Sequence, residues 1–261
     1  MNRFENDTNP LSGGLVLMVI AIMLCSVLSA GITIFAAPVE GELDSSTSFA
    51  VAKASSDWVK VGESDSSGQY GGSPTTSTSY TDSSGNTYLT GFLIGDVKFG
   101  SNQVSASQDA FIAKIDTSGN WQMVEAAGQY GGGGFSWAND IVVDSSGNIF
   151  ITGFFSGNVS FGNSQLRSTT DSNGGDTTDI FVAKMSSSGN WLWAKDAGGS
   201  YDGDSGNGVA SDGNGGAYVV GAFNISGTWG ANGYGTNGYS DAFIAHISSS
   251  GAWGWVATGG G

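Results

Sequence analysis

Residues 144–198 decide the fold, because two other parts of the chain repeat the text of this stretch. It opens with Asp-Ser-Ser-Gly-Asn at residues 144–148 and an apolar run to Gly153. Later it reads Asp-Ile-Phe-Val-Ala-Lys at 179–184 and Ser-Gly-Asn-Trp at 188–191. Related text starts at Asp82 and again at Asp212. A period of roughly 60–70 residues indicates repeated structural units that stack on one another.

Within one repeat the apolar residues alternate with polar ones, which predicts β-strands. Short Gly-containing polar loops join the first strand to the second and the third to the fourth, as expected for hairpins. Four strands joined in this way form an antiparallel meander that is too small to bury its faces alone, so neighbouring copies must stack. Such units are typical of the blades of a β-propeller. The expected strands are Ala138–Val143, Ile149–Phe155, Asp179–Met185 and Trp191–Lys195.

Tryptophan recurs with the repeat, and its spacing predicts which face of the sheet it occupies. Trp191 and Trp253 hold equivalent positions, so we expect them to pack between repeats. Because alternate residues of a strand share a face, Trp193 and Trp255 are predicted to lie on the same face as these two.

The repeated text resembles a known family of surface proteins. Asp-x-x-Gly-Asn followed by Thr152-Gly153, then Phe161-Gly162, Asp-Ile-Phe-Val-Ala-Lys and Gly-Asn-Trp, is similar to the prokaryotic seven-bladed β-propeller repeat (SBBP-type). The resemblance covers roughly residues 49–261, and its third copy departs from the pattern, with Val220 in the place of Thr152. It implies a propeller on an exported protein and carries no common activity.

Counting the repeats predicts an all-β fold with an incomplete β-propeller. We expect about three and a half four-stranded antiparallel blades in residues 49–261. The expected boundaries are a half blade at 49–67 and blades at about 68–127, 128–197 and 198–261. Propellers close with about four to eight blades, so the missing blades are expected from a continuation of the chain or from a second chain.

The N-terminal part predicts one transmembrane helix. Residues 1–13 form a short polar tail. The expected membrane segment is 14–37; its residues 15–37 carry no charge and are long enough to cross a bilayer. A cleaved signal peptide and a pilin-like helix, cut near Gly14 and packed in a filament, are the alternatives. The acidic, Ser-rich linker at 38–48 places the repeats on the outer side. The prediction is therefore a single-pass protein of the cell membrane with an extracellular propeller.

Charge and cysteine content narrow the classes of partner. The chain has 23 acidic and 8 basic side chains and a formal net charge of −15, which argues against nucleic acid as a partner. Its one cysteine, Cys25, lies in the apolar run, so no disulfide is expected to support the repeats.

The one cofactor hypothesis from the sequence is a weak calcium-binding site. Asp202, Asp204 and Asn207 place oxygen-bearing side chains close together in sequence, as calcium loops do. The Asp-x-x-Gly-Asn turns have one carboxylate each, so their aspartates are expected to bond the backbone of their own turn. No other cofactor is expected.

No residue stands out as catalytic. His246, the chain's one histidine, occupies the place that Lys184 holds in the preceding repeat, and no nucleophile is paired with it. Propeller sialidases need several arginines, whereas the region after residue 37 offers Arg167 alone. A carbohydrate-active enzyme with an undetected carboxylate pair remains the alternative to a non-catalytic module.

The loops between the second and third strands vary most in length, so one rim of the propeller is the expected ligand site. The residues expected there, suited to a glycan or a protein ligand, are Tyr70, Tyr130, Trp137, Arg167, Tyr201 and Tyr234. Asn158 and Asn224 match the pattern of N-glycosylation acceptors. Together these features predict a membrane-anchored extracellular module for adhesion, recognition or surface structure.

Overall fold

The computed structural model describes residues 50–52, 59–61, 63–64 and 73–261, and all of the regular secondary structure in them is β-strand. Contacts divide the chain into two units, residues 1–43 with 52–58 and residues 44–51 with 59–261, and strands β2 to β16 lie in the second. Within the described ranges no helix has the length and hydropathy to cross a membrane. The tail, the expected membrane segment and the linker lie outside those ranges, as does most of the half blade.

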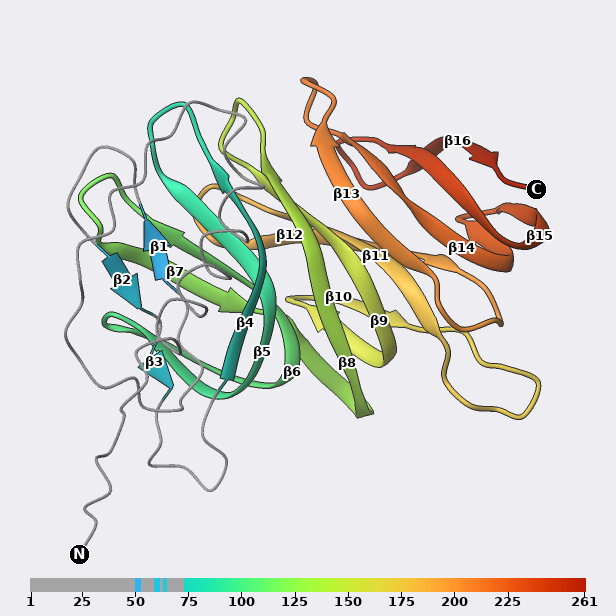
Figure 1. Ribbon diagram of the computed structural model, residues 1–261, viewed down its shortest axis with the longest axis horizontal. Helices are drawn as coiled ribbons and strands as arrows, with labels where there is room; N and C mark the ends of the chain where they lie inside the picture. Colours follow the sequence, from blue (N-terminus) through green and yellow to red (C-terminus); the bar gives the residue numbers. More distant parts are fainter. Residues whose placement is uncertain (1–49, 53–58, 62, 65–72) are drawn as a thin grey trace, which may run out of the picture. The chain divides into compact units, whose positions relative to one another are not determined.

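Three four-stranded antiparallel meanders follow one another along the chain (Figure 1). Sheet one consists of β4 (Ser73–Thr81), β5 (Thr87–Phe99), β6 (Asn102–Ile115) and β7 (Trp121–Ala126). Sheet two consists of β8 (Gly128–Val143), β9 (Ile149–Phe161), β11 (Thr178–Met185) and β12 (Trp191–Gly198). Sheet three consists of β13 (Ser205–Ser211), β14 (Ala217–Trp229), β15 (Asn232–Ile247) and β16 (Trp253–Gly259).

Four shorter strands complete the described structure: β1 (Ala50–Ala52), β2 (Val59–Val61), β3 (Glu63–Ser64) and β10 (Ser164–Arg167). β1 pairs with β2, β3 with the far end of β5, and β10 with the far end of β9. Two pairs of residues, Ala197 with Trp229 and Gly198 with Thr228, join β12 to β14 at a corner of sheets two and three. The prediction of an all-β, antiparallel fold is confirmed, and the described strands do not form a closed ring.

The Asp-Ser-Ser-Gly-Asn turn forms because its side chain and its glycine satisfy the backbone of a tight hairpin. Asp144 Oδ1 accepts hydrogen bonds from the backbone N–H groups of Ser146 and Asn148, both at 2.9 Å. Gly147 adopts a φ of 79°, a left-handed conformation that costs a residue with a Cβ but not glycine. These bonds confirm the prediction that the aspartate stabilises its own turn.

The Thr-Gly pair in the second strand of the first two repeats, Val-Gly in the third, has a glycine because of close backbone contact. A Cβ placed on Gly153 would lie 1.9 Å from the carbonyl oxygen of Trp137 on β8, so only glycine fits at this position. The neighbouring β-bulge, where the register shifts between Ala138 and Asp140, brings the two backbones together. Thr152 beside it is fully buried and donates a 2.8 Å hydrogen bond to the carbonyl of Phe181.

The sheets pack face to face, and each interior face contributes to a core shared with its neighbour. Sheets one and two share a cluster that includes Ile112, Ile151 and Phe181. Sheets two and three share a second cluster that includes Val182 and Phe243. The other face of sheet one carries a third cluster of eight buried side chains: Leu89, Leu93, Val97, Phe99, Ala106, Phe111, Ala113 and Val124. Buried side chains therefore lie on both faces of sheets one and two.

The prediction for the tryptophans is wrong in one respect. Trp193 lies on the face opposite to Trp191, although the two residues are two positions apart. The register between β11 and β12 shifts so that Lys184 pairs with Trp193 while Met185 pairs with Trp191, which leaves Leu192 as the extra residue of a bulge. One inserted residue reverses the face of everything beyond it, and the same shift separates Trp253 from Trp255.

Candidate functional site

An open cavity of about 780 Å³, with a lining of mixed polarity, is the candidate functional site. It lies where the end of β10, the connection after β12 and the hairpin between β14 and β15 meet. Five glycines lie in its walls; Gly233 and Gly235 are exposed, whereas Gly198, Gly199 and Gly227 are buried. Its lining consists of Arg167, Ser168, Thr169, Thr170, Gly198, Gly199, Ser200, Ser226, Gly227, Thr228, Gly233, Tyr234 and Gly235.

One wall of the cavity is built by the insertion between β10 and β11. Thr170 and Asp176 form an isolated antiparallel bridge, and Asp171 turns the chain between them. Asp171 Oδ1 accepts hydrogen bonds from the N–H groups of Asn173 and Gly175, both at 2.8 Å. The insertion is therefore a small hairpin that uses the same aspartate turn as the main repeats.

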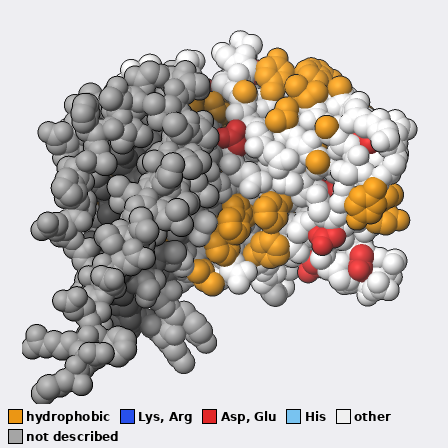
Figure 2. Space-filling model, in the orientation of Figure 1, with side chains coloured by type: hydrophobic (Ala, Val, Ile, Leu, Met, Phe, Trp, Pro, Cys, Tyr) orange, Lys and Arg blue, Asp and Glu red, His pale blue; other side chains and the backbone are white. Residues whose placement is uncertain are grey.

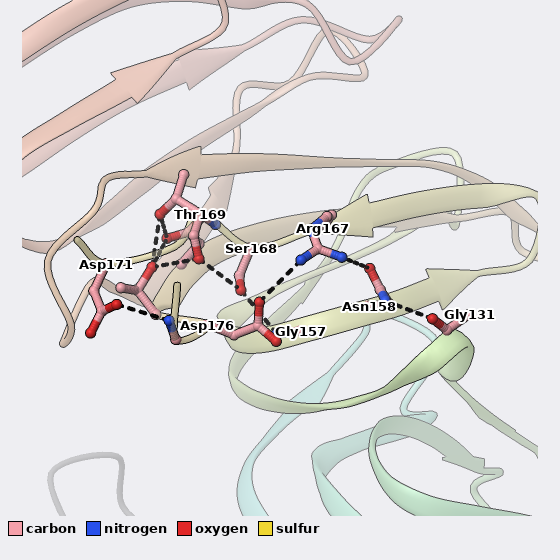
Figure 3. A network of polar contacts seen from close by, with 11 residues as sticks. Gly131, Gly157, Asn158, Arg167, Ser168, Thr169, Asp171 and Asp176 are labelled. Atoms are coloured by element: carbon pink, nitrogen blue, oxygen red, sulfur yellow. Dashed lines mark hydrogen bonds and ion pairs between the residues drawn. The ribbon is translucent and has the colours of Figure 1, made fainter. Parts of the chain in front are cut away.

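The guanidinium of Arg167, at the start of this wall, is held by two side chains (Figure 3). Its Nη1 donates to Asn158 Oδ1 at 3.2 Å, and its Nη2 donates to Asp176 Oδ1 at 3.4 Å. Asn158 is itself fixed, because its Nδ2 donates to the carbonyl of Gly131. The guanidinium keeps 58% of its side-chain surface exposed. It therefore retains N–H groups that are free to face solvent or a ligand.

Two buried carboxylates hold the inner wall. Asp179 Oδ2 accepts a 2.8 Å hydrogen bond from the N–H of Thr169, and Thr169 Oγ1 donates to Asp179 Oδ1 at 3.0 Å. Asp204 Oδ2 accepts from the N–H of Gly199 at 2.9 Å, and its Oδ1 accepts from the N–H of Asn224 at 2.8 Å. Thr169 and Gly199 both line the cavity, so these carboxylates position its walls from behind.

Burial changes the acidity of both groups. Loss of solvent raises the pKa of Asp204 to about 7, although the two backbone N–H bonds oppose the shift, and the nearby charges of Asp179 and Asp202 add to it. Burial likewise raises the pKa of Asp179 to about 6, against the opposing hydrogen bonds from Thr169. Charged carboxylates are costly away from water, which is the physical cause of both shifts. Neither carboxylate is among the cavity-lining residues.

The structure brings two of the expected rim residues into the cavity, Arg167 and Tyr234. Trp137 lies elsewhere, with its ring stacked between those of Phe92 and Phe154 and its Nε1 donating to Ser77 Oγ at 2.8 Å. Tyr130 belongs to β8, and Tyr201 is 47% exposed in the connection after β12, but neither lines the cavity. Tyr70 lies outside the described residues.

The three residues considered for calcium use their oxygens within the protein. Asp202 Oδ1 accepts from the N–H and hydroxyl of Thr178, and Asn207 Oδ1 accepts from Ser205 Oγ. Both oxygens of Asp204 accept from backbone N–H groups, as described above. In the described parts of the chain no group of three or more His, Cys, Asp or Glu residues is arranged to hold a metal ion.

The two glycosylation acceptors are buried in the fold. Asn158 and Asn224 have 8% and 9% of their surface exposed. Each amide nitrogen donates to a backbone carbonyl, of Gly131 for Asn158 and of Asp202 for Asn224. A glycan at either position would therefore have to be attached before the strands pair.

His246 has a structural setting. Its Nε2 lies 2.9 Å from Oδ2 of Asp212, the turn aspartate between β13 and β14. Its ring lies near those of Tyr218 and Trp255, away from the cavity. The preceding repeat places Lys184 there, and that amine donates to the carbonyl of Gly215 at 2.7 Å.

Comparison with known proteins adds no family. No protein-family model matches the sequence, and a search of curated proteins finds none that is similar. The chemistry of the cavity therefore comes from its own residues. Its described lining combines one arginine, one tyrosine, several Ser and Thr residues and five glycines, and contains no Asp, Glu, His, Lys or Cys.

Most of this lining was missed by reading the sequence. Ser168, Thr169, Ser200, Ser226 and Thr228 have no motif, and they come from three separate segments. The signal that points to them is the length of the insertion after Phe161 in the second repeat, compared with the shorter connections of the other two.

Proposed function

We propose that this protein is a membrane-anchored, outward-facing module of propeller type that binds a glycan without catalysis. The observation that carries the proposal is the joining of Arg167 and Tyr234 in one cavity, although they lie on β10 and β15. Stacked four-stranded repeats, an uncharged N-terminal run and an acidic, cysteine-poor repeat region support the membrane-anchored and propeller-type parts.

The chemistry of the cavity favours a sugar polymer. A volume of about 780 Å³ lies within the usual range for a small-molecule site and has room for a few linked sugar rings. Hydroxyls and peptide groups match the donors and acceptors of a sugar, the phenol ring of Tyr234 offers an apolar surface, and Arg167 suits an acidic substituent. General acid–base cleavage of a glycan needs a pair of carboxylates at the bond, and the described lining offers none.

A steric substitution tests the site directly. A Cβ on Gly233 meets no atom within 4 Å, and this glycine has no left-handed φ, so Gly233→Phe fills the cavity without straining the fold. We expect this variant of the full chain, in lipid nanodiscs, to lose binding on a glycan array and to weaken calorimetric affinity by about tenfold or more. Gly259→Phe, at a similarly open glycine of β16, is the matched control.

Arg167→Gln separates charge from shape. The exposed ion pair with Asp176 contributes only about 0–1 kcal/mol to stability, so the variant should stay folded. It should weaken binding of acidic glycans more than of neutral ones.

Two outcomes would contradict the proposal. If the wild-type and Gly233→Phe proteins give the same array signal, the cavity is not the binding site. If shortened sugar chains are released, the enzyme alternative is favoured.

The membrane anchor is tested separately, by fractionating cells that express the protein with and without residues 15–37.

A further inference from the structure

Ile225, on β14, has a backbone conformation that a β-branched residue seldom adopts. Its φ is 58°, and among the described residues no other non-glycine residue has a positive φ. In this left-handed region a branched side chain crowds its own backbone, so the conformation is strained. Such strain persists only where the surrounding structure enforces it, and it is concentrated at functional sites.

The other repeats have glycine at the same position. The second strand of each sheet pairs with one of three equivalent aspartates, Asp109, Asp179 and Asp241. Two places after that pairing stand Gly95 in sheet one, Gly157 in sheet two and Ile225 in sheet three. The two glycines have φ angles of 77° and 73°, which cost glycine nothing. The conformation is therefore common to the repeats, and only sheet three places a side chain on it.

Packing of the core does not explain this side chain. Ile225 is half-buried, and it belongs neither to the three core clusters of the described residues nor to the partly buried residues packed against them. Hydrophobic side chains are exposed at several places over the C-terminal strands (Figure 2). The backbone conformation of Ile225, and not its exposure, is therefore what distinguishes it.

Hydrogen bonds on both sides fix Ile225 at the edge of the cavity. The N–H of the preceding asparagine donates to Asp204 Oδ1 at 2.8 Å. The carbonyl of Ile225 accepts from Thr236 Oγ1 at 3.3 Å. The next residue, Ser226, pairs with Gly235, and both line the cavity. These contacts hold the strained residue beside the candidate site.

We propose that Ile225 is a specificity-determining residue of the cavity and contacts an apolar substituent of the bound glycan. The inference rests on the proposed function and adds the kind of sugar that the site selects. An aliphatic side chain offers no hydrogen bond, so it favours a methyl group over a sugar hydroxyl that would lose its water. An acetamido group supplies such a methyl, and its amide suits the Ser and Thr hydroxyls of the lining.

Two neutral sugar chains with the same linkage measure this preference. Tetra-N-acetylchitotetraose carries acetamido groups where cellotetraose carries hydroxyls. The full chain in lipid nanodiscs should bind the acetylated sugar more tightly in calorimetry. Ile225→Gly should reduce this preference about fourfold or more, the effect of one buried methyl group, whereas Ile225→Val should retain it. Gly233→Phe should lose both sugars.

Thermal unfolding without ligand separates a binding role from a packing role. Ile225→Gly removes the strain together with a half-buried side chain, so its melting temperature should stay within about 3 °C of the wild type. A larger fall would show that the side chain supports the fold, and would overturn the proposal. Gly95→Ile puts the same side chain on the same conformation in sheet one and should lower the melting temperature by roughly 3 °C or more. If it does not, the conformation carries no strain and the proposal fails.

The binding data distinguish this inference from the proposed function. If Gly233→Phe abolishes binding while Ile225→Gly keeps the preference, the cavity is the site but Ile225 does not select its ligand. If both variants bind as the wild type does, the cavity is not the site and both proposals fail. If the wild type binds neither sugar, or does not prefer the acetylated one, the role of Ile225 is refuted, and the glycan array alone decides on the proposed function.

Discussion

The indole nitrogen of Trp193 donates a 3.0 Å hydrogen bond to the backbone carbonyl of Ser249, 56 positions later in the chain. The bond joins the fourth strand of sheet two to the last hairpin turn of sheet three, and the ring itself is 9% exposed. A reciprocal bond runs from Trp253 Nε1 to the carbonyl of Asp196. Neighbouring repeats are therefore joined by hydrogen bonds from tryptophan indoles at the sheet edges and by apolar side chains that pack between the sheets.

Replacing Trp193 tests the strength of this tie. Trp193→Phe keeps an aromatic ring but removes the donor, so the carbonyl of Ser249 loses its partner. We expect the free energy of unfolding to fall by about 1–2 kcal/mol in urea denaturation. Trp255→Phe, at the 50% exposed equivalent position, should change it by no more than about 0.5 kcal/mol. Equal losses at the two sites would mean that the bond between sheets adds no stability.

The hairpin turns make a second prediction. Asp144→Ala removes the acceptor of two backbone N–H bonds at a residue that is 8% exposed. The donors that remain lack a partner, so unfolding should become easier by about 1–3 kcal/mol. Ser145→Ala in the same turn, at an exposed residue, is the control and should be close to neutral. A chemical denaturation curve of each variant decides between them.

Stability should fall as the pH rises from about 4 to 7. Asp204 has a folded-state pKa of about 7, above the unfolded value of about 4, so the folded protein retains a proton that the unfolded chain has lost. The stabilising effect of that proton is complete below pH 4 and disappears as the pH passes 7. Asp179, with a pKa of about 6, acts in the same direction over a narrower window.

Thermal unfolding at pH 4 to 8 measures this slope, and Asp204→Asn should flatten it. The same substitution should lower stability at pH 5, because an amide cannot accept from both Gly199 and Asn224. A slope that is unchanged in Asp204→Asn would assign the pH dependence to other groups.

Removal of calcium should leave the protein unchanged. The side-chain oxygens of Asp202, Asp204 and Asn207 already accept hydrogen bonds from protein donors. Treatment with EGTA should therefore shift the melting temperature by no more than about 1–2 °C, since an ion bound to the folded state alone would raise it by more. A larger shift that Asp202→Asn abolishes would place a calcium ion at this loop.

The features that could be predicted from the sequence are those that depend on residues close together in the chain. The alternation around Ile151 predicts a strand, and the aspartate and glycine of residues 144–148 predict a hairpin, because both are consequences of local backbone chemistry. The same reasoning failed at Trp193. Leu192 is exposed in a bulge, and nothing local in the text marks the extra residue.

What the sequence by itself determined is therefore the repeat, its antiparallel strands and its turns, since each depends on residues a few positions apart. Only the tertiary structure decided which groups meet across repeats. It placed Arg167 and Tyr234 in the lining of one cavity, placed Asp179 and Asp204 behind one wall, and left Trp255 50% exposed. These arrangements arise from packing and from the register of strands far apart in the chain, which local patterns do not encode.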